Sequence, residues 1–504
     1  MPFLLDTQVF FPALLVVLPL LCAPVCILIR NRHVSWATAM LATWGSFFVA
    51  IGIVLHVNGN GVLVHEFGNW SAPWGIEYRI DALNSFFILL VTGTAALSVT
   101  YGYESLRKEL DHNLHHYFWG TFLLCLAGLL GVCATGDAFN AFVFLEISSL
   151  STYILIALSR DRRGLYSAYQ YLILGTIGAT FFVIGVGLLY LVTGSLNLQD
   201  IAVHLGDATE ARPKLAALAF IVVGITLKLA LFPLHWWLPN AYASAPSVAS
   251  SFLAASATKV AIYLLLRFCF DTFDQTRIFE GLPIGHLISI FSVLAIVVGS
   301  AIAIFEKDVK RAFAYSSVSQ IGFITMGIGL STPEGFRATL LFVVAHAVTK
   351  GAVFMLLGCF SFRIGHRLTL SNIRGAAKHM PYTSGALVLA GLSLVGVPGT
   401  IGFLGKWSLV EAFIQSGNPY FAFFILVSSL LTVVYVWRII GALYDSANSV
   451  IGDAAGNAVR KEAPISMLVT TGVLVCLIVI WGLEASVPLA GAANAAALLT
   501  SHFW

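Results

Sequence analysis

Four lysines lie inside long apolar stretches of this sequence: Lys228, Lys259, Lys350 and Lys406. A lysine at the centre of a membrane helix costs roughly 2.5–3.5 kcal/mol on insertion scales, so four would together cost on the order of 10 kcal/mol. Such residues need a partner, water or an uncharged state. Lys228 and Lys259 lie about two turns or more into their stretches, which favours proton chemistry. Lys406 adjoins Trp407, so a snorkelling position near a helix end stays open for it.

Carboxylates inside apolar stretches are scarcer. The clearest is Glu146, in the segment Phe-Val-Phe-Leu-Glu-Ile-Ser-Ser-Leu-Ser. A buried carboxylate is tolerable when it faces an ammonium group, and we expect Lys228 to be that partner. The pair either takes part in proton movement or is a purely structural ion pair. Glu411, five residues after Lys406, is a further candidate that is either buried or reaches the membrane surface.

Histidine adds a group that titrates near neutral pH. His346 and Lys350 are four residues apart and therefore share one helix face. An imidazole with an unperturbed pKa near 6.5 relays protons readily, and the neighbouring lysine favours this role over simple core packing. His235, just beyond Lys228, is a second candidate, although it also fits an aromatic belt with the two tryptophans that follow it. We predict a proton path in chain order through Glu146, Lys228, Lys259, His346, Lys350 and Lys406.

Motifs for other chemistry are missing from the sequence. Its seven cysteines form no CxxC pair, and neither HExxH nor GxSxG occurs. We therefore expect no cofactor and no metal, and a free-standing intramembrane enzyme lacks support. The net charge of +3 is too small to indicate a nucleic-acid binder.

The composition indicates the elements that position these residues. Of 504 residues, 59% are hydrophobic and only 10% are charged, whereas soluble domains carry about 25% charged residues. We predict an all-α polytopic membrane protein with about fourteen membrane-spanning helices of roughly 20 residues. They lie near residues 9–29, 34–56, 83–103, 115–134, 138–158, 167–193, 215–233, 246–268, 286–305, 312–330, 337–361, 384–416, 420–443 and 465–484.

Basic residues in the loops predict the orientation. Loops after odd-numbered spans contain 17 of the 27 Lys and Arg residues, among them Lys310, Arg460 and Lys461. Loops after even-numbered spans contain 6, which are Arg79, Arg212, Lys214, Arg267, Arg277 and Arg337. The positive-inside rule therefore places the odd-numbered loops in the cytoplasm and both termini outside, in the periplasm of a bacterial inner membrane.

Two spans are interrupted. The seventh runs into Pro233 and Pro239, and the twelfth contains Gly396, Pro398 and Gly399. Such breaks are tolerated at membrane depth only against protein or a wet cavity, and paired breaks indicate a transporter site built from inverted repeats. We predict two inverted five-helix repeats. The chain then divides into residues 1–110 (helices 1–3), 111–270 (helices 4–8), 271–445 (helices 9–13) and 446–504 (helix 14).

These segments together resemble the antiporter-like subunits shared by Mrp-type multisubunit cation/proton antiporters and respiratory complex I. The resemblance covers most of residues 79–440 and implies fourteen helices with two inverted repeats. The matching segments are Leu227–Pro239, Ala245–Ser247, Lys307–Ser317, His346–Lys350 and Gly396–Lys406, and Arg79–Leu83 is similar to the family's segment that enters the third helix.

The resemblance also implies roles for single residues. Glu146 and Lys228 look like the family's ion pair between the fifth and seventh helices, and Lys259 like its central lysine of the eighth. His346 with Lys350 is similar to the relay of the eleventh helix. Lys406 is similar to the terminal residue of the twelfth, which opens towards one side of the membrane. The length and the segment after Glu146 are most similar to the D subunit of Mrp antiporters.

The expected function is a proton-translocating subunit of a multisubunit antiporter for sodium or another monovalent cation. Its partners would be the other membrane subunits of that complex, protons and the cation. The alternative is a proton-pumping subunit of a quinone-reducing or hydrogenase-type redox enzyme. The chain would carry no redox centre in either assembly, so the neighbouring genes separate the two.

Overall fold

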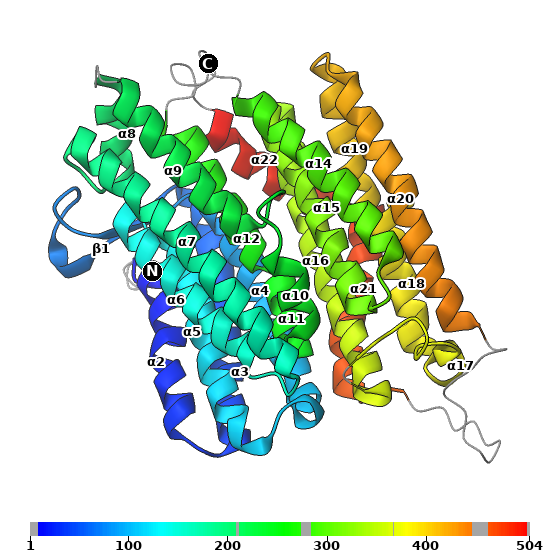
Figure 1. Ribbon diagram of the computed structural model, residues 1–504. Coiled ribbons are helices and arrows are strands. Elements are labelled where there is room, and N and C mark those ends of the chain that lie inside the picture. The colour runs from blue at the N-terminus through cyan, green and yellow to red at the C-terminus, as the bar shows by residue number, and fades with distance from the viewer. Residues whose placement is uncertain (1–8, 208–210, 274–283, 366, 446–461, 501–504) are drawn as a thin grey trace.

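The computed structural model describes residues 9–207, 211–273, 284–365, 367–445 and 462–500. Helices make up most of this part of the chain and run side by side (Figure 1). The loop residues Arg277, Arg460 and Lys461 and the two ends of the chain, used above for orientation, lie outside the described residues.

The first half of the chain contains eleven of the described helices. They are α2 (Phe11–Leu28), α3 (Arg32–Asn60), α4 (Ala82–Glu109), α5 (His115–Ala134), α6 (Ala138–Ala157), α7 (Arg162–Thr193), α8 (Leu198–Asp207), α9 (Ala211–Leu229), α10 (Trp237–Ser244), α11 (Ser247–Ala255) and α12 (Ala257–Arg267). A single π-helical turn, η3 (Phe268–Thr272), follows α12.

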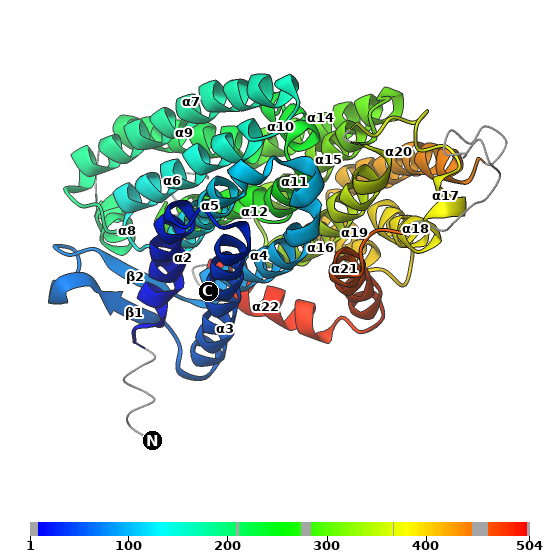
Figure 2. The same cartoon turned by 90° about the horizontal axis from the view of Figure 1, so that it is seen from below.

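The second half begins after residue 283. Its described helices are α14 (Ile284–Phe305), α15 (Val309–Gly329), α16 (Pro333–Ile364), α17 (Ala376–His379), α18 (Pro381–Val395), α19 (Ile401–Gln415), α20 (Pro419–Tyr444), α21 (Ile465–Leu483) and α22 (Ser486–Thr500). Seen from below, α8 lies at one end of an elongated body and α17 and α20 lie at the other (Figure 2).

Two features depart from the predicted set of helices. A short antiparallel hairpin pairs β1 (Leu63–Glu66) with β2 (Glu77–Ile80). In addition, the segment predicted to hold only helix 14 contains both α21 and α22. The last helix, α22, packs against α4 and α16, along one long side of the body (Figure 2).

All fourteen predicted ranges fall on helical segments. Eleven helices among the described residues are long and apolar enough to cross a membrane. Three of the predicted ranges are not among those eleven; they correspond to α9, to α15 and to α18 together with α19. Large apolar side chains such as Leu41, Leu191 and Trp437 are exposed on the surface, as contact with lipid requires. The architecture is that of a helical polytopic membrane protein.

Both predicted interruptions are present. α9 ends at Leu229 and helix resumes only at Trp237, while α18 ends at Val395 and α19 begins at Ile401. Gly396 and Gly399 turn the second break with φ values of 90° and 86°, which an L side chain rarely adopts.

A third interruption separates α11 from α12 at Ser256, whose φ and ψ are −122° and −55°. Neither proline nor glycine occurs between Ser247 and Arg267. The sequence therefore carried none of the usual signals of a helix break, and this one was not predicted.

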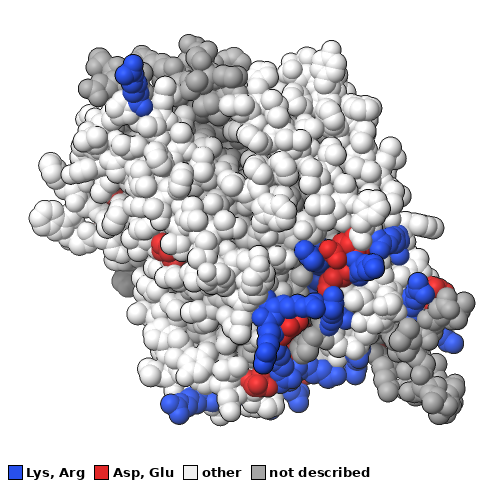
Figure 3. Space-filling view, viewed as in Figure 1, with Lys and Arg blue, Asp and Glu red and all other residues white. Residues whose placement is uncertain are grey.

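Charged side chains gather in one region of the visible face, while most of the remaining surface lacks them (Figure 3). We call this region the basic end; it is formed by the loops that follow α2, α4, α6, α14 and α16. One loop assignment was wrong, because Arg267 is the last residue of α12 and is buried. Lys310, also counted as a loop residue, is buried in the first turn of α15.

Candidate functional site

Glu146 and Lys228 lie opposite each other on α6 and α9. The Lys228 Nζ atom is 3.8 Å from Glu146 Oε1, and the lysine side chain is 7% exposed. Lys228 also donates to Ser149 Oγ at 2.5 Å, and Ser149 in turn donates to the carbonyl of Leu145. The structure thus brings the predicted pair together.

The position of Lys228 in its helix favours a cation. It lies in the last turn of α9, where the unpaired carbonyls and the helix dipole attract positive charge. The break that follows begins at Ala230, whose φ is 59°. On the opposite side of the pair, Asp137 caps the N-terminus of α6 by accepting a hydrogen bond from the backbone amide of Asn140 at 2.6 Å.

Lys259 is completely buried in the first turn of α12. Its amino group donates to the carbonyl of Ala254, in the last turn of α11, and to Thr258 Oγ1 at 3.4 Å. The break at Ser256 is what allows this contact, because it brings the end of α11 within reach of a residue on α12.

His346 and Lys350 share the buried face of α16. Lys350 donates to the carbonyl of Phe313 at 2.9 Å and to the hydroxyl of Ser316, both on α15. Neither ring nitrogen of His346 has a hydrogen-bond partner among the described residues. A buried imidazole with two free nitrogens is suited to binding water and relaying protons.

Lys406 lies at the second predicted break. Its amino group donates to the carbonyls of Leu394 and Val395, the last two residues of α18, at 2.8 and 3.0 Å. It also donates to Ser429 Oγ at 3.1 Å, and the side chain is 5% exposed. Snorkelling is therefore wrong for Lys406, whereas the adjoining Trp407 is exposed.

Electrostatic interactions connect four of these residues. Lys259, His346 and Lys350 lie close enough to affect one another electrostatically, and Lys350 also interacts with Lys406. The predicted residues therefore form two groups: the pair Glu146–Lys228, and a row of buried basic groups. We call the second group the basic row; it consists of Lys259, His346, Lys350 and Lys406.

The two remaining candidates differ in position. His235 is buried, its ring stacks on Phe232 at a centroid distance of 5.3 Å, and Tyr315 lies at 6.5 Å. Trp236 is exposed, so it rather than His235 fits an interfacial belt. Glu411 is exposed on α19 and accepts from Gln415 at 3.1 Å, outside the basic row.

A buried ion-pair cluster was missed by the sequence analysis. Arg267 binds Asp81 at 2.8 Å and Asp271 at 2.9 Å, and thereby joins the start of α4 to the end of α12. The signal available in the sequence is that Arg267 directly follows the apolar run Tyr263–Leu266.

Comparisons with known proteins identify the family of the chain. A model of the family described as "NADH:quinone oxidoreductase/Mrp antiporter, TM" matches residues 135–432. The chain is 40% identical over 489 residues to NADH-quinone oxidoreductase subunit N of Desulforudis audaxviator, covering 94% of this chain and 95% of that protein. It is 30% identical over 491 residues to antiporter subunit mnhD2 of Staphylococcus aureus, with 96% and 95% covered.

Solved structures show the same fold. One chain of an archaeal respiratory complex, the membrane-bound sulfane sulfur reductase, superposes with a TM-score of 0.88 at 28% identity over 97% of each chain. A chain of the Mrp complex from Dietzia sp. superposes with a TM-score of 0.86 at 25% identity, over 98% of this chain and 97% of that one. The chain belongs to the antiporter-like membrane subunit family that NADH:quinone oxidoreductases and Mrp antiporters share.

Proposed function

We propose that this chain carries protons through the membrane along Glu146, Lys228 and the basic row, as one subunit of a multisubunit ion-translocating complex. The basic row is the observation that supports this proposal most directly. Its four members are each 5% exposed or less, and each interacts electrostatically with at least one other member. Burying this many basic groups is costly, and a chain of titratable groups bridged by water is a use that explains the cost.

The pair Glu146–Lys228 would control the first step. Two unit charges 3.8 Å apart attract by roughly 4 kcal/mol at an effective dielectric constant of about 20. Glu146 Oε1 accepts no hydrogen bond among the described residues, so the carboxylate is held less firmly than the lysine. Protonation or displacement of Glu146 removes the attraction, and Lys228 then passes its proton by way of water to Lys259.

The arrangement in the membrane is part of the proposal. All fourteen predicted ranges would cross the bilayer, with α18 and α19 together making one broken span. The two breaks next to Lys228 and Lys406 would occupy equivalent places in two inverted five-helix repeats. The basic end would face the cytoplasm of a bacterial inner membrane.

The energy source of the complex has two candidates. The resemblance to Mrp D subunits supports a sodium or other monovalent cation/proton antiporter. The higher identity of 40% to a relative named as a quinone oxidoreductase subunit supports proton pumping in a redox-driven complex. The proton path within this chain would be the same in both.

The test measures proton movement in everted membrane vesicles that contain the whole gene cluster. In Lys259→Ala we expect proton movement to be abolished while the complex still assembles, because the basic row loses its first member. The matched control is Lys378→Ala, at an exposed lysine of the basic end, which should transport normally. Wild-type rates in Lys259→Ala would rule out the proposed path.

A further inference from the structure

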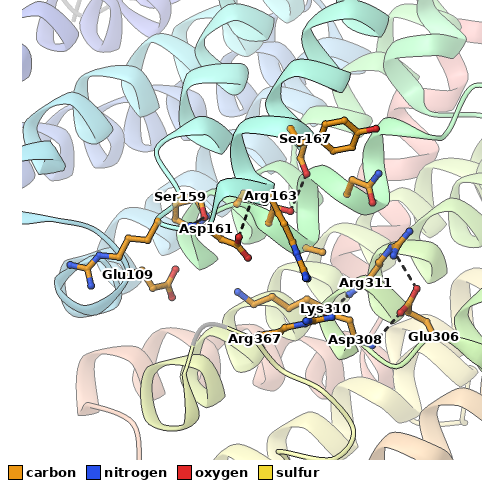
Figure 4. A pocket seen from close by; sticks show the side chains of 17 residues that line it. Glu109, Ser159, Asp161, Arg163, Ser167, Glu306, Asp308, Lys310, Arg311 and Arg367 are labelled. Carbon is orange, nitrogen blue, oxygen red and sulfur yellow. Dashed lines mark hydrogen bonds and ion pairs between the residues drawn. The ribbon is translucent and has the colours of Figure 1, made fainter.

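A pocket opens at the basic end between segments that are distant in the sequence. Its volume is about 430 Å³, and its walls come from the end of α4, the loop and first turns of α7, α10, and the loop between α14 and α15. Figure 4 shows charged side chains of both signs around it, among them Arg163, Glu306, Arg311 and Arg367. The pocket is wide and polar enough to admit water.

A buried carboxylate lies in the wall of this pocket. Glu109, the last residue of α4, is only 4% exposed. It accepts a hydrogen bond from the backbone N–H of Ser247 at 2.5 Å and another from Ser105 Oγ at 3.1 Å. Because Ser247 is the first residue of α11, Glu109 caps the N-terminus of that helix, where negative charge is stabilised.

A buried lysine, Lys310, also contacts Ser247. Lys310 is 5% exposed and donates to Ser247 Oγ at 3.0 Å. In Figure 4 its side chain extends across the pocket toward Glu109. Two buried groups of opposite charge therefore meet at the point where α11 begins. Neither was singled out from the sequence, and neither belongs to the basic row.

Helix α11 connects this point with the basic row. Ser247 and Ser251 are four residues apart, so their hydroxyls share one side of α11, and Thr258 lies beyond the break at Ser256, in the first turn of α12. All three are buried, and Thr258 Oγ1 accepts from Lys259 Nζ. Ser247 and Lys259 are twelve positions apart, which corresponds to about 18 Å along an unbroken helix.

We propose that Glu109 takes up protons from water in this pocket and delivers them along the hydroxyl-bearing side of α11 to Lys259. A hydronium ion gives its proton to a carboxylate oxygen of Glu109 and leaves as water. The protonated carboxyl then passes the proton to a water on the α11 side, and the Lys259 amine is the final acceptor. Lys310 stabilises the carboxylate that remains. This inference rests on the proposed function, because it adds an entrance that joins the same path at Lys259.

The first test replaces Glu109 in everted vesicles that carry the whole complex. Glu109→Gln can still accept from the Ser247 amide but cannot carry a proton. We expect the proton flux to fall about tenfold or more, since proton transfer by a positioned side chain contributes on the order of 10²–10⁴. Glu109→Asp should retain most of the flux. The matched control, Glu104→Gln, lies on the same helix, pairs with Arg107 outside the pocket and should change nothing.

The second test blocks the pocket without touching Glu109. Ser244 lines the pocket, so Ser244→Cys should lose transport when a membrane-impermeant thiol reagent is added to everted vesicles. Ser371→Cys, exposed at the same end but outside this pocket, should be labelled and remain active. This test decides the question if the Glu109 variants fail to assemble on a native gel.

Two results would overturn the inference. One is wild-type flux in Glu109→Gln, and the other is unchanged flux after complete labelling of Ser244→Cys. The Lys259→Ala variant shows whether only the proposed entrance fails or the whole proposed proton path. If Lys259→Ala is inactive while Glu109→Gln transports normally, only the proposed entrance through Glu109 is ruled out. If Lys259→Ala itself transports normally, the proposed function fails.

Discussion

The oxygen partners of the buried lysines explain how apolar helices hold four amino groups. Lys259, Lys350 and Lys406 each donate to backbone carbonyls of a neighbouring helical segment. Lys228 instead faces the carboxylate of Glu146. A carbonyl accepts from both a charged and a neutral amine, whereas a carboxylate specifically favours the charged form. The Glu146–Lys228 pair is therefore the place where a change of charge has the largest effect.

Removing one charge of this pair should stop proton movement. In Glu146→Gln and in Lys228→Ala we expect dye-detected acidification of everted vesicles to be abolished, because the remaining group loses the partner that sets its protonation. The complex should still assemble on a native gel. Glu411→Gln, at an exposed glutamate, is the control and should behave as wild type. Normal acidification by either pair variant would leave the pair with a structural role only.

A substitution at His346 distinguishes a role in proton relay from a role in core packing. Its ring nitrogens have no partners among the described residues, so a residue of similar bulk would satisfy packing equally well. We expect His346→Met to assemble and to lose most proton flux, because methionine fills the space but cannot bind and release a proton. Flux at the wild-type level in this variant would show that the histidine only fills the core.

At the scale of the helix, each of three breaks lies next to a lysine of the path. The breaks after α9, α11 and α18 leave carbonyls without helical partners inside the bundle. Lys259 and Lys406 donate to those carbonyls directly, while Lys228 lies in the last turn before its break. Breaking a helix therefore supplies the polar groups that a buried amine needs.

The break between α18 and α19 depends on the close approach of Gly402 to Ser393. A Cβ atom at Gly402 would collide with the backbone carbonyl oxygen of Ser393. We expect Gly402→Ala to push the two half-helices apart, displace Lys406 and reduce both assembly and flux. Gly385→Ala, where a Cβ meets no atom within 4 Å, is the matched control. Equal assembly of the two variants on a native gel would contradict this account.

At the scale of the whole molecule, the gathering of charge at the basic end predicts the topology. Ser371 is exposed at that end, and Glu334 is exposed at the start of α16, at the other end of that helix. In a background without the exposed Cys476, Ser371→Cys should react with an impermeant thiol reagent in everted vesicles only. Glu334→Cys should react in right-side-out vesicles only. The reverse pattern would mean that the basic end faces outward.

The type of complex to which this chain belongs, antiporter or redox-driven pump, is also a property of the whole molecule and its partners. We expect sodium, lithium or potassium pulses to dissipate a pH gradient across vesicles carrying the full gene cluster if the complex is an antiporter. Acidification that instead requires a quinone and a reductant would identify the redox-driven alternative. The assay compares the three cations with a quinone-reducing substrate in the same vesicles, with Lys259→Ala as the inactive reference.

The sequence by itself determined the helical architecture, both proline- and glycine-marked breaks, and the identity of the buried charges. The physical reason is that hydropathy, helix breakers and charges inside apolar stretches act locally along the chain. It failed at Ser256, where a break occurs without proline or glycine, and at Arg267, which it placed in a loop. The short hairpin and α22 were missed as well, because neither has the length of a membrane span.

Only the tertiary structure decided which groups meet. Glu109 ends one helix and Lys310 begins another, and both appear in the sequence as ordinary charges at helix ends. They converge on Ser247 because α4 packs against α11 while α15 packs against α10, the helix just before α11. The separations along the chain, 138 residues for one contact and 63 for the other, exceed any local pattern. Tertiary packing likewise decides that Lys406 is buried and Glu411 is exposed. Burial depends on which helices cover a face, and that is a property of packing rather than of spacing.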